Sequence, residues 1–299
     1  MKISSLFINL YAIIFSLLIA IGFFGYGVDY YMGYSRASIY WGSIYDRVGF
    51  ALSILQYKNI WIGAFISSIL QFIFYERFLS ERFKNSFPIY KILIIILLSF
   101  SWSHLLTSLN MVRQGIAVNT FFILTLFPNK KFINIIYLFI GLFLHKISPF
   151  LLFIRQLKNQ QFLRNKIFKL SIAFILTSTI FTYVKITNSF SNPNPGIDLK
   201  YIIIFILIIN STFIYIKRKI IPENIKFVSI FYPSLILGFI ITDTTAYSER
   251  LFVNYLPFIL LNCLYLFKND NNFRLSYILL LSTYVFISWT IGPLKNGLY

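Results

Sequence analysis

Long apolar stretches separated by short polar or basic segments run along the whole chain. Most of these stretches are roughly 17–22 residues long, the length that an α-helix needs to cross the hydrocarbon core of a bilayer. The pattern predicts an all-α, polytopic integral membrane protein. The expected single spans are about 3–24, 58–75, 87–103, 108–127, 167–187, 200–216, 226–242, 251–267 and 275–291.

The apolar segment 132–154 is long enough for one tilted span, whereas two full crossings need about 40 residues. Basic residues flank it on both sides, at 128–131 and 155–169. With the N-terminus inside, a single span would leave more basic residues outside than inside, against the positive-inside rule. We therefore predict a short helical hairpin or re-entrant pair, with its tip near His145–Lys146 in a cavity open to the outside. The total is then about 10–11 transmembrane segments.

This topology predicts a single transmembrane domain over residues 1–299, with an external loop at 25–57 and no soluble domain. The first apolar stretch is too long for a signal-peptide core and has no clear cleavage site, so we expect a retained span. Further external loops are expected at 188–199 and 243–250, and cytoplasmic loops at 76–86, 155–166, 217–219 and 268–274.

The composition agrees with a membrane protein, since 58% of residues are apolar and 12% are charged, about half the charged share of soluble proteins. The net charge of +18 would suggest nucleic acid for a soluble chain. In a membrane protein, the positions of lysine and arginine chiefly indicate how the chain is oriented across the bilayer, so no nucleic-acid partner is expected. One cysteine and two histidines argue against a disulfide or a zinc site, and we expect no metal and no other cofactor.

Charged groups in or beside the spans collect on the predicted outer half, and such groups are costly in a membrane and functional candidates by default. Arg113, with Gln114 and Asn110 nearby, forms a polar stripe in an apolar run. Its guanidinium would bind a phosphate or diphosphate bidentately, but a structural arginine reaching the interface explains it as well. The other members of the outer group are Asp29, Asp46, Arg47, His145, Lys146, Asp243, Glu249 and Arg250.

His145 has two interpretations, a general base or hydrogen-bond donor, and a structural group with satisfied hydrogen bonds. Ser148 follows three residues later and would share its helical face. Arg250 follows Glu249, and sequence neighbours on a helix do not face each other, so one charge can point into a cavity or anchor the span end. The tyrosines and Trp41 of the first loop suit either an interfacial belt or a platform for sugar rings.

Several short motifs occur in a characteristic order: GYGVDY, YDRVGFALS, RQGIA, HKIS and ERLFVNY. This order, over roughly residues 20–260, resembles the EpsG-like branch of the Wzy-type polysaccharide polymerases, which make capsule, exopolysaccharide and O-antigen. The resemblance implies a glycosyltransferase at the outer face of the cytoplasmic (inner) membrane. Such an enzyme transfers a growing glycan from undecaprenyl diphosphate onto the non-reducing end of a new lipid-linked repeat unit.

The resemblance implies catalytic roles for Asp29, Arg113, His145 and Arg250. The two arginines would stabilise charge on the leaving diphosphate, and Asp29 or His145 would accept the acceptor's proton. The expected partners are the lipid-linked oligosaccharide and membrane lipid, with a chain-length regulator as a further possibility. The implied substrate-binding residues are Tyr30, Asp46, Arg47, Gln114, Lys146 and Ser148, with Asp46 standing where the family more often has glutamate.

Three alternatives stay open. A polyprenyl-phosphate-sugar-dependent membrane glycosyltransferase usually has a substantial external domain, whereas the longest predicted external loop is residues 25–57. A flippase for lipid-linked oligosaccharide, which is not an enzyme, predicts internal pseudo-symmetry and charges through both membrane halves. A membrane acyltransferase would use the hairpin histidine, but no neighbouring acid supports it.

Overall fold

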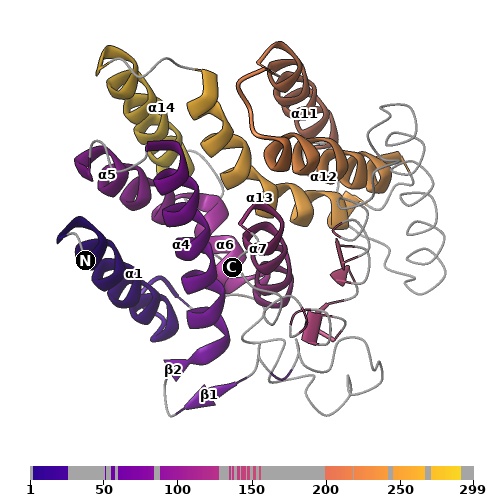
Figure 1. The fold of residues 1–299 in the computed structure, drawn as a ribbon. Helices are drawn as coiled ribbons and strands as arrows, with labels where there is room; N and C mark the ends of the chain where they lie inside the picture. The colour runs from indigo at the N-terminus through magenta and orange to yellow at the C-terminus, as the bar shows by residue number, and fades with distance from the viewer. Residues whose placement is uncertain are drawn as a thin grey trace. The chain divides into compact units, whose positions relative to one another are not determined.

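The computed structural model describes residues 3–25, 60–83, 88–127, 199–217, 219–241, 245–266 and 271–290, with Ala51, residues 55–57 and scattered positions between 135 and 155. The described part is nearly all helical, which confirms the predicted all-α class for these residues (Figure 1). The chain divides into two compact units, one of residues 1–148 and 260–299 and the other of residues 149–259.

The first unit contains six helices, a 3₁₀ turn and a two-stranded hairpin among its described residues. They are α1 (Ile3–Ala20), β1 (Gln56–Tyr57), β2 (Ile60–Trp61), α4 (Ile62–Phe83), α5 (Pro88–Ser99), α6 (Trp102–Leu109), α7 (Val112–Leu126), η3 (Cys263–Leu266) and α14 (Asn271–Thr290). The second unit contains α11 (Leu199–Ile216), α12 (Glu223–Ile241) and residues 245–259 of α13 (Thr245–Asn262).

Two described helices, α4 and α12, are long and apolar enough to cross a membrane, and the bent pair α5–α6 makes a third if it counts as one span. Helix α4 begins at Ile62, after an antiparallel hairpin that pairs Gln56 with Trp61 and Tyr57 with Ile60. The helix continues to Phe83 and so includes residues 76–83, which the sequence predicted as loop. Shorter apolar helices lie within α1, α7, α11 and α14.

The predicted span 87–103 is broken, because α5 and α6 meet at an angle of 56°. Ser101 is the N-cap of α6 and accepts a hydrogen bond from the His104 backbone N–H at 3.3 Å. The Phe100 carbonyl, freed by the break, accepts a hydrogen bond from Trp289 Nε1 at 2.9 Å. These contacts satisfy two backbone polar groups of the bend within the protein, as non-helical backbone at membrane depth requires.

The helices α4 and α7 run parallel, whereas α1 runs antiparallel to α4. Ser67 donates to the Thr107 carbonyl at 3.1 Å beside Gly115, and seven residues along both helices Phe74 packs on Phe122 at 5.4 Å between ring centroids. A Cβ at Gly115 would lie 2.5 Å from Thr107 Cγ2, so only glycine allows this approach.

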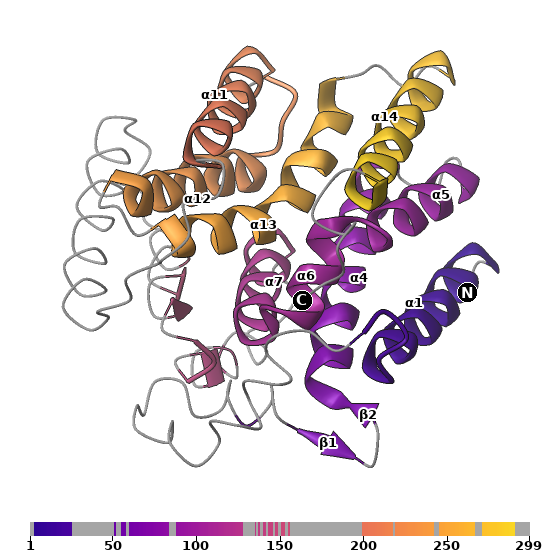
Figure 2. The same cartoon turned by 180° about the vertical axis from the view of Figure 1, so that it is seen from behind.

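The direction of α1 follows from its side-chain contacts with α4. Ser16 donates to Ser68 at 2.8 Å, and Tyr11 packs edge-on against Phe72 at 5.8 Å between centroids. Figures 1 and 2 both show α1 beside α4. The end of α1 and the beginnings of α4 and α7 therefore lie at one end of the first unit.

The far end of α4 is joined to η3. Arg82 donates through Nε and Nη2 to the Leu264 carbonyl at 3.4 and 3.3 Å, and its guanidinium lies 5.1 Å from the centre of the Tyr265 ring. Phe78, one turn earlier, contacts the same ring edge-on. This cation–π and hydrogen-bonding contact holds the end of α4 in place.

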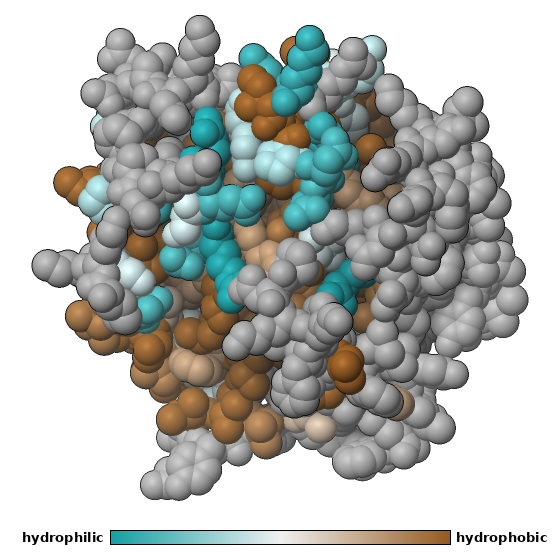
Figure 3. Space-filling model, in the orientation of Figure 1, coloured by the Kyte–Doolittle hydropathy of each residue, from teal (hydrophilic) through white to brown (hydrophobic). Residues whose placement is uncertain are grey.

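The outer faces of several helices carry large apolar side chains. On α1 these are Leu6, Phe7, Leu10, Ile13, Ile14 and Leu17. Figure 3 shows apolar side chains gathered at the lower left, where Figure 1 draws α1. Helices α11 and α14 carry similar side chains, whereas the inward Ser16 of α1 is fully buried.

Candidate functional site

Arg113 and Gln114 lie in the first turn of α7, which begins at Val112. The N-cap residue, Met111, makes no side-chain capping bond. A helix N-terminus carries partial positive charge and N–H groups that point away from the helix, so it favours an anion. The cationic Arg113 side chain adds a full positive charge at the same position. The start of α7 therefore has the chemistry to bind a phosphate group.

Gln114 is an unusual buried donor. Its side chain is 4% exposed, and its Nε2 has no hydrogen-bond partner within the described part of the chain. Side chains on a helix lean toward its N-terminus, which brings the amide toward the end that carries Arg113. Asn110, which the sequence grouped with these two residues, instead caps the end of α6.

This site lies at the end of the first unit where α1 ends and α4 begins. The chain leaves α1 at this end and returns through the β1–β2 hairpin. The predicted loop 25–57 thus connects two elements that both reach the end where Arg113 lies. Its candidate residues Asp29, Tyr30, Asp46 and Arg47 lie outside the described residues.

His145 and Ser148 share a turn. The Ser148 backbone N–H donates to the His145 carbonyl at 2.8 Å, and the Ile147 N–H donates to His145 Nδ1 at 3.2 Å. The His145 side chain is half-buried, whereas Ser148 is fully buried and its Oγ has no partner among the described residues. Lys146 lies outside the described residues.

The segment that contains this turn is tied to α7. Tyr137 donates a hydrogen bond to the Ala117 carbonyl at 3.2 Å, one turn from Arg113.

A neutral imidazole carries one proton, and Nδ1 of His145 acts as an acceptor. The neutral ring in this geometry therefore carries its proton on Nε2, an assignment made from the hydrogen bond.

Arg250 belongs to the second unit. Helix α13 begins at Thr245, so Arg250 is helical, although the sequence placed it in a loop that ends at 250. Its side chain is exposed, and its carbonyl accepts a hydrogen bond from Asn254 Nδ2 at 2.7 Å. The structure thus groups Arg113 with Gln114, and His145 with Ser148, in the first unit.

His104, which no sequence pattern singled out, lies at the centre of a buried polar cluster between α4 and α6. Its ring is fully buried, with Nε2 3.0 Å from Ser68 Oγ and Nδ1 3.3 Å from the Tyr75 hydroxyl. The ring also packs against Phe15 and Phe72. Because both ring nitrogens have partners, His104 anchors α6 to α4, and neither nitrogen is available to act as a base.

Further hydrogen bonds extend the cluster along both helices. The Tyr75 hydroxyl donates to Gln71 Oε1 at 3.2 Å, and Gln71 Nε2 donates to Ser108 Oγ at 2.9 Å and to the His104 carbonyl at 3.3 Å. The available signal was the polar run SWSHLLTS at 101–108, which interrupts two apolar stretches. Satisfied buried networks of this kind fix helices in one arrangement.

Among the described residues, no three His, Cys, Asp or Glu side chains come together as they would around a metal ion. Cys263 is a free thiol. Comparisons with family models, with curated proteins and with solved structures found no match to this chain.

Proposed function

We propose that this protein is a multi-pass polysaccharide polymerase that joins undecaprenyl-diphosphate-linked oligosaccharide units at the outer face of the cytoplasmic membrane. The observation that carries the proposal is the start of α7. There, Arg113, the buried Gln114 amide and a helix N-terminus without a side-chain cap lie together. This combination of one cation and neutral donors suits a diphosphate.

The reaction moves one glycan between two oxygens. The acceptor hydroxyl oxygen bonds to the anomeric carbon of the donor glycan, while the bond from that carbon to the diphosphate oxygen breaks. The diphosphate leaves with the electron pair, and the hydroxyl proton passes to a base. Arg113 stabilises the charge that builds on the leaving oxygens, which is where a fixed cation contributes most to the rate.

The tautomer of His145 bears on the choice of base. With Nδ1 accepting the Ile147 N–H, Nε2 of the neutral ring is a donor. A donor can bind a phosphate or sugar oxygen but cannot take up the acceptor's proton from that side. We therefore assign His145 to hydrogen-bond donation and Asp29 to proton acceptance.

The distribution of side chains supports a membrane location. The interior of the first unit holds the hydrogen-bonded His104 cluster, while α1 and α14 expose isoleucine, leucine and phenylalanine. Lipid tails can surround such an apolar outer face, whereas water would leave it unfavourably exposed. The positive-inside rule then predicts the N-terminus and the C-terminal end of α4 inside, and the Arg113 end outside.

The proposal is tested by complementation of a strain that lacks the gene, with the length of its surface glycan as the readout. Arg113→Ala should abolish long chains and leave single repeat units on the lipid, and Arg113→Lys should restore chains only in part. The matched control, Lys226→Gln, removes a half-buried cation that is paired with Glu223 at 2.8 Å, and should keep long chains.

Two outcomes would overturn the proposal. Long chains in the Arg113→Ala strain would exclude the phosphate role of this arginine. Loss of every exported repeat unit from the deletion strain would indicate a flippase in place of a polymerase.

A further inference from the structure

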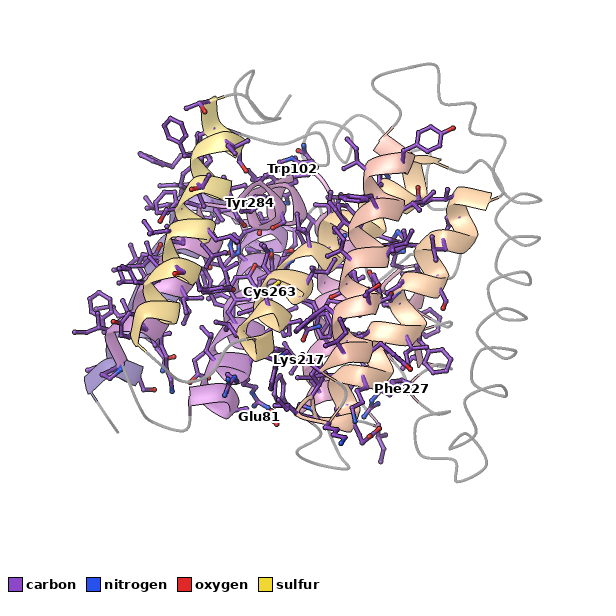
Figure 4. The ribbon with its side chains drawn as sticks, turned by 90° about the horizontal axis from the view of Figure 1, so that it is seen from above. Glu81, Trp102, Lys217, Phe227, Cys263 and Tyr284 are labelled. Carbon is purple, nitrogen blue, oxygen red and sulfur yellow. The ribbon has the colours of Figure 1, made fainter. Side chains whose placement is uncertain are left out.

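The turn between α11 and α12 combines exposed apolar side chains with cations. Tyr215, Ile216 and Ile220 are 65%, 68% and 62% exposed, although each is large and apolar or aromatic. Lys217 and Lys219 stand between them in the sequence, and Figure 4 labels Lys217 at this end of α11. The same short surface thus presents both an apolar part and positive charge.

The backbone of this turn is well anchored. The N–H groups of Ile220 and Ile221 both donate to the Lys217 carbonyl, at 2.9 and 3.3 Å. Ile221 is buried at 2% exposure and fixes the turn to the rest of its unit. The exposure of Ile220 next to the buried Ile221 is therefore set by the fold, with neighbouring side chains on opposite sides of the turn.

The charge of the turn is not neutralised by the carboxylate that follows it. Glu223, in the first turn of α12, pairs with Lys226 at 2.8 Å. The positive charges of Lys217 and Lys219 therefore add to the field at the surface.

Such a surface matches the chemistry of an anionic phospholipid. Apolar side chains gain free energy by entering the acyl-chain region, and lysine reaches from there to the phosphate with its ammonium group. Each lysine near an anionic leaflet contributes about fivefold to the affinity. Binding to a soluble protein would not explain why the turn lies at the end of an apolar helix.

We propose that the α11–α12 turn is a binding site for the headgroup of an anionic phospholipid. Lys217 and Lys219 bind the phosphate, and Tyr215, Ile216 and Ile220 lie among the upper acyl carbons. The site rests on the proposed membrane location but does not depend on the polymerase reaction. It would fix this end of α11 at the inner leaflet, where the sequence predicts segment 217–219.

The test uses the full-length protein in nanodiscs of phosphatidylcholine, with and without phosphatidylglycerol. Native mass spectrometry measures how strongly each lipid is retained. The wild-type protein should retain phosphatidylglycerol in preference to phosphatidylcholine. Lys217→Gln combined with Lys219→Gln should reduce this preference about thirtyfold, since each lysine contributes about fivefold. Arg218 is left unchanged.

The matched control is Lys226→Gln combined with Glu223→Gln, which removes this ion pair without changing the net charge beside the turn, and it should keep the wild-type preference. The thermal midpoint in pure phosphatidylcholine should be the same for all variants, which shows that they are folded. Three results would overturn the site: no preference in the wild type, an unchanged preference in the double variant, or an equal loss in the control.

Discussion

The two histidines of the chain lie in opposite kinds of surroundings. His104 is fully buried in the first unit, and both of its ring nitrogens contact hydroxyl groups from α4. His145 is half-buried in a turn, and its Nδ1 accepts a backbone N–H only two residues away. The first histidine connects segments that are far apart in sequence, whereas the Nδ1 bond of the second joins neighbouring residues.

The difference predicts a role in stability for His104 and a role in activity for His145. A buried side chain that satisfies several partners costs much free energy to remove, because the partners lose their hydrogen bonds as well. A half-exposed side chain loses less buried contact when it is removed, and it can reach a substrate. We therefore expect His104 to control the free energy of unfolding and His145 to control activity.

The largest expected effect is that of His104→Ala. The substitution opens a cavity among Phe15, Phe72 and Tyr75 and leaves the Ser68 and Tyr75 hydroxyls without this partner. The free energy of unfolding should fall by about 3–5 kcal/mol. Thermal unfolding of the purified protein in detergent measures it, with His145→Ala as the control. Similar midpoints for the two variants would remove the distinction between the histidines.

A smaller effect is expected for Tyr75→Phe, which keeps the ring and removes only the hydroxyl. His104 Nδ1 and Gln71 Oε1 then lose a partner at an almost unchanged volume. The expected loss is about 1–2 kcal/mol, measured in the same unfolding assay. In the double variant with His104→Ala, the total loss in free energy of unfolding should be smaller than the sum of the two single losses, because the two residues share one hydrogen bond. Full additivity would show that this bond contributes nothing.

The smallest effect on stability is expected at His145, within about 0.5 kcal/mol. Its effect on chain growth depends on the role of Nε2. A glutamine amide can place an N–H near the position of Nε2, so His145→Gln should keep part of the activity. In His145→Phe, the rate of chain growth should fall about 100-fold. Glycan length and rate of chain growth measure this. If the glutamine variant is as inactive as the phenylalanine variant, His145 acts as a base.

Much of the helical pattern was predictable from the apolar stretches. Helix α11 was expected at 200–216 and spans Leu199–Ile216, and α14 was expected at 275–291 and spans Asn271–Thr290. The bend between α5 and α6 was not predictable from hydropathy, because Ile, Leu and Phe continue up to the break. Its stabilising contacts include Trp289, which lies far away in the sequence.

The candidate site was predictable where a polar residue interrupts an apolar run, as Arg113 and Gln114 do. The start of α7 was placed at 108 and lies at Val112, so the residues at the helix terminus became clear only in the structure. The role of His104 depends on partners in α4 that sequence spacing does not reveal.

The central claim is that the start of α7 binds a diphosphate. The most direct measurement is the affinity of the purified protein for geranyl diphosphate, compared with geraniol, in the wild type and in Arg113→Ala. A charge-assisted, bidentate contact is worth about 1.5–3 kcal/mol. The wild type should therefore prefer the diphosphate, and Arg113→Ala should bind it about 10–100-fold more weakly, with no change for geraniol. Equal affinities of the two proteins for geranyl diphosphate would contradict the account.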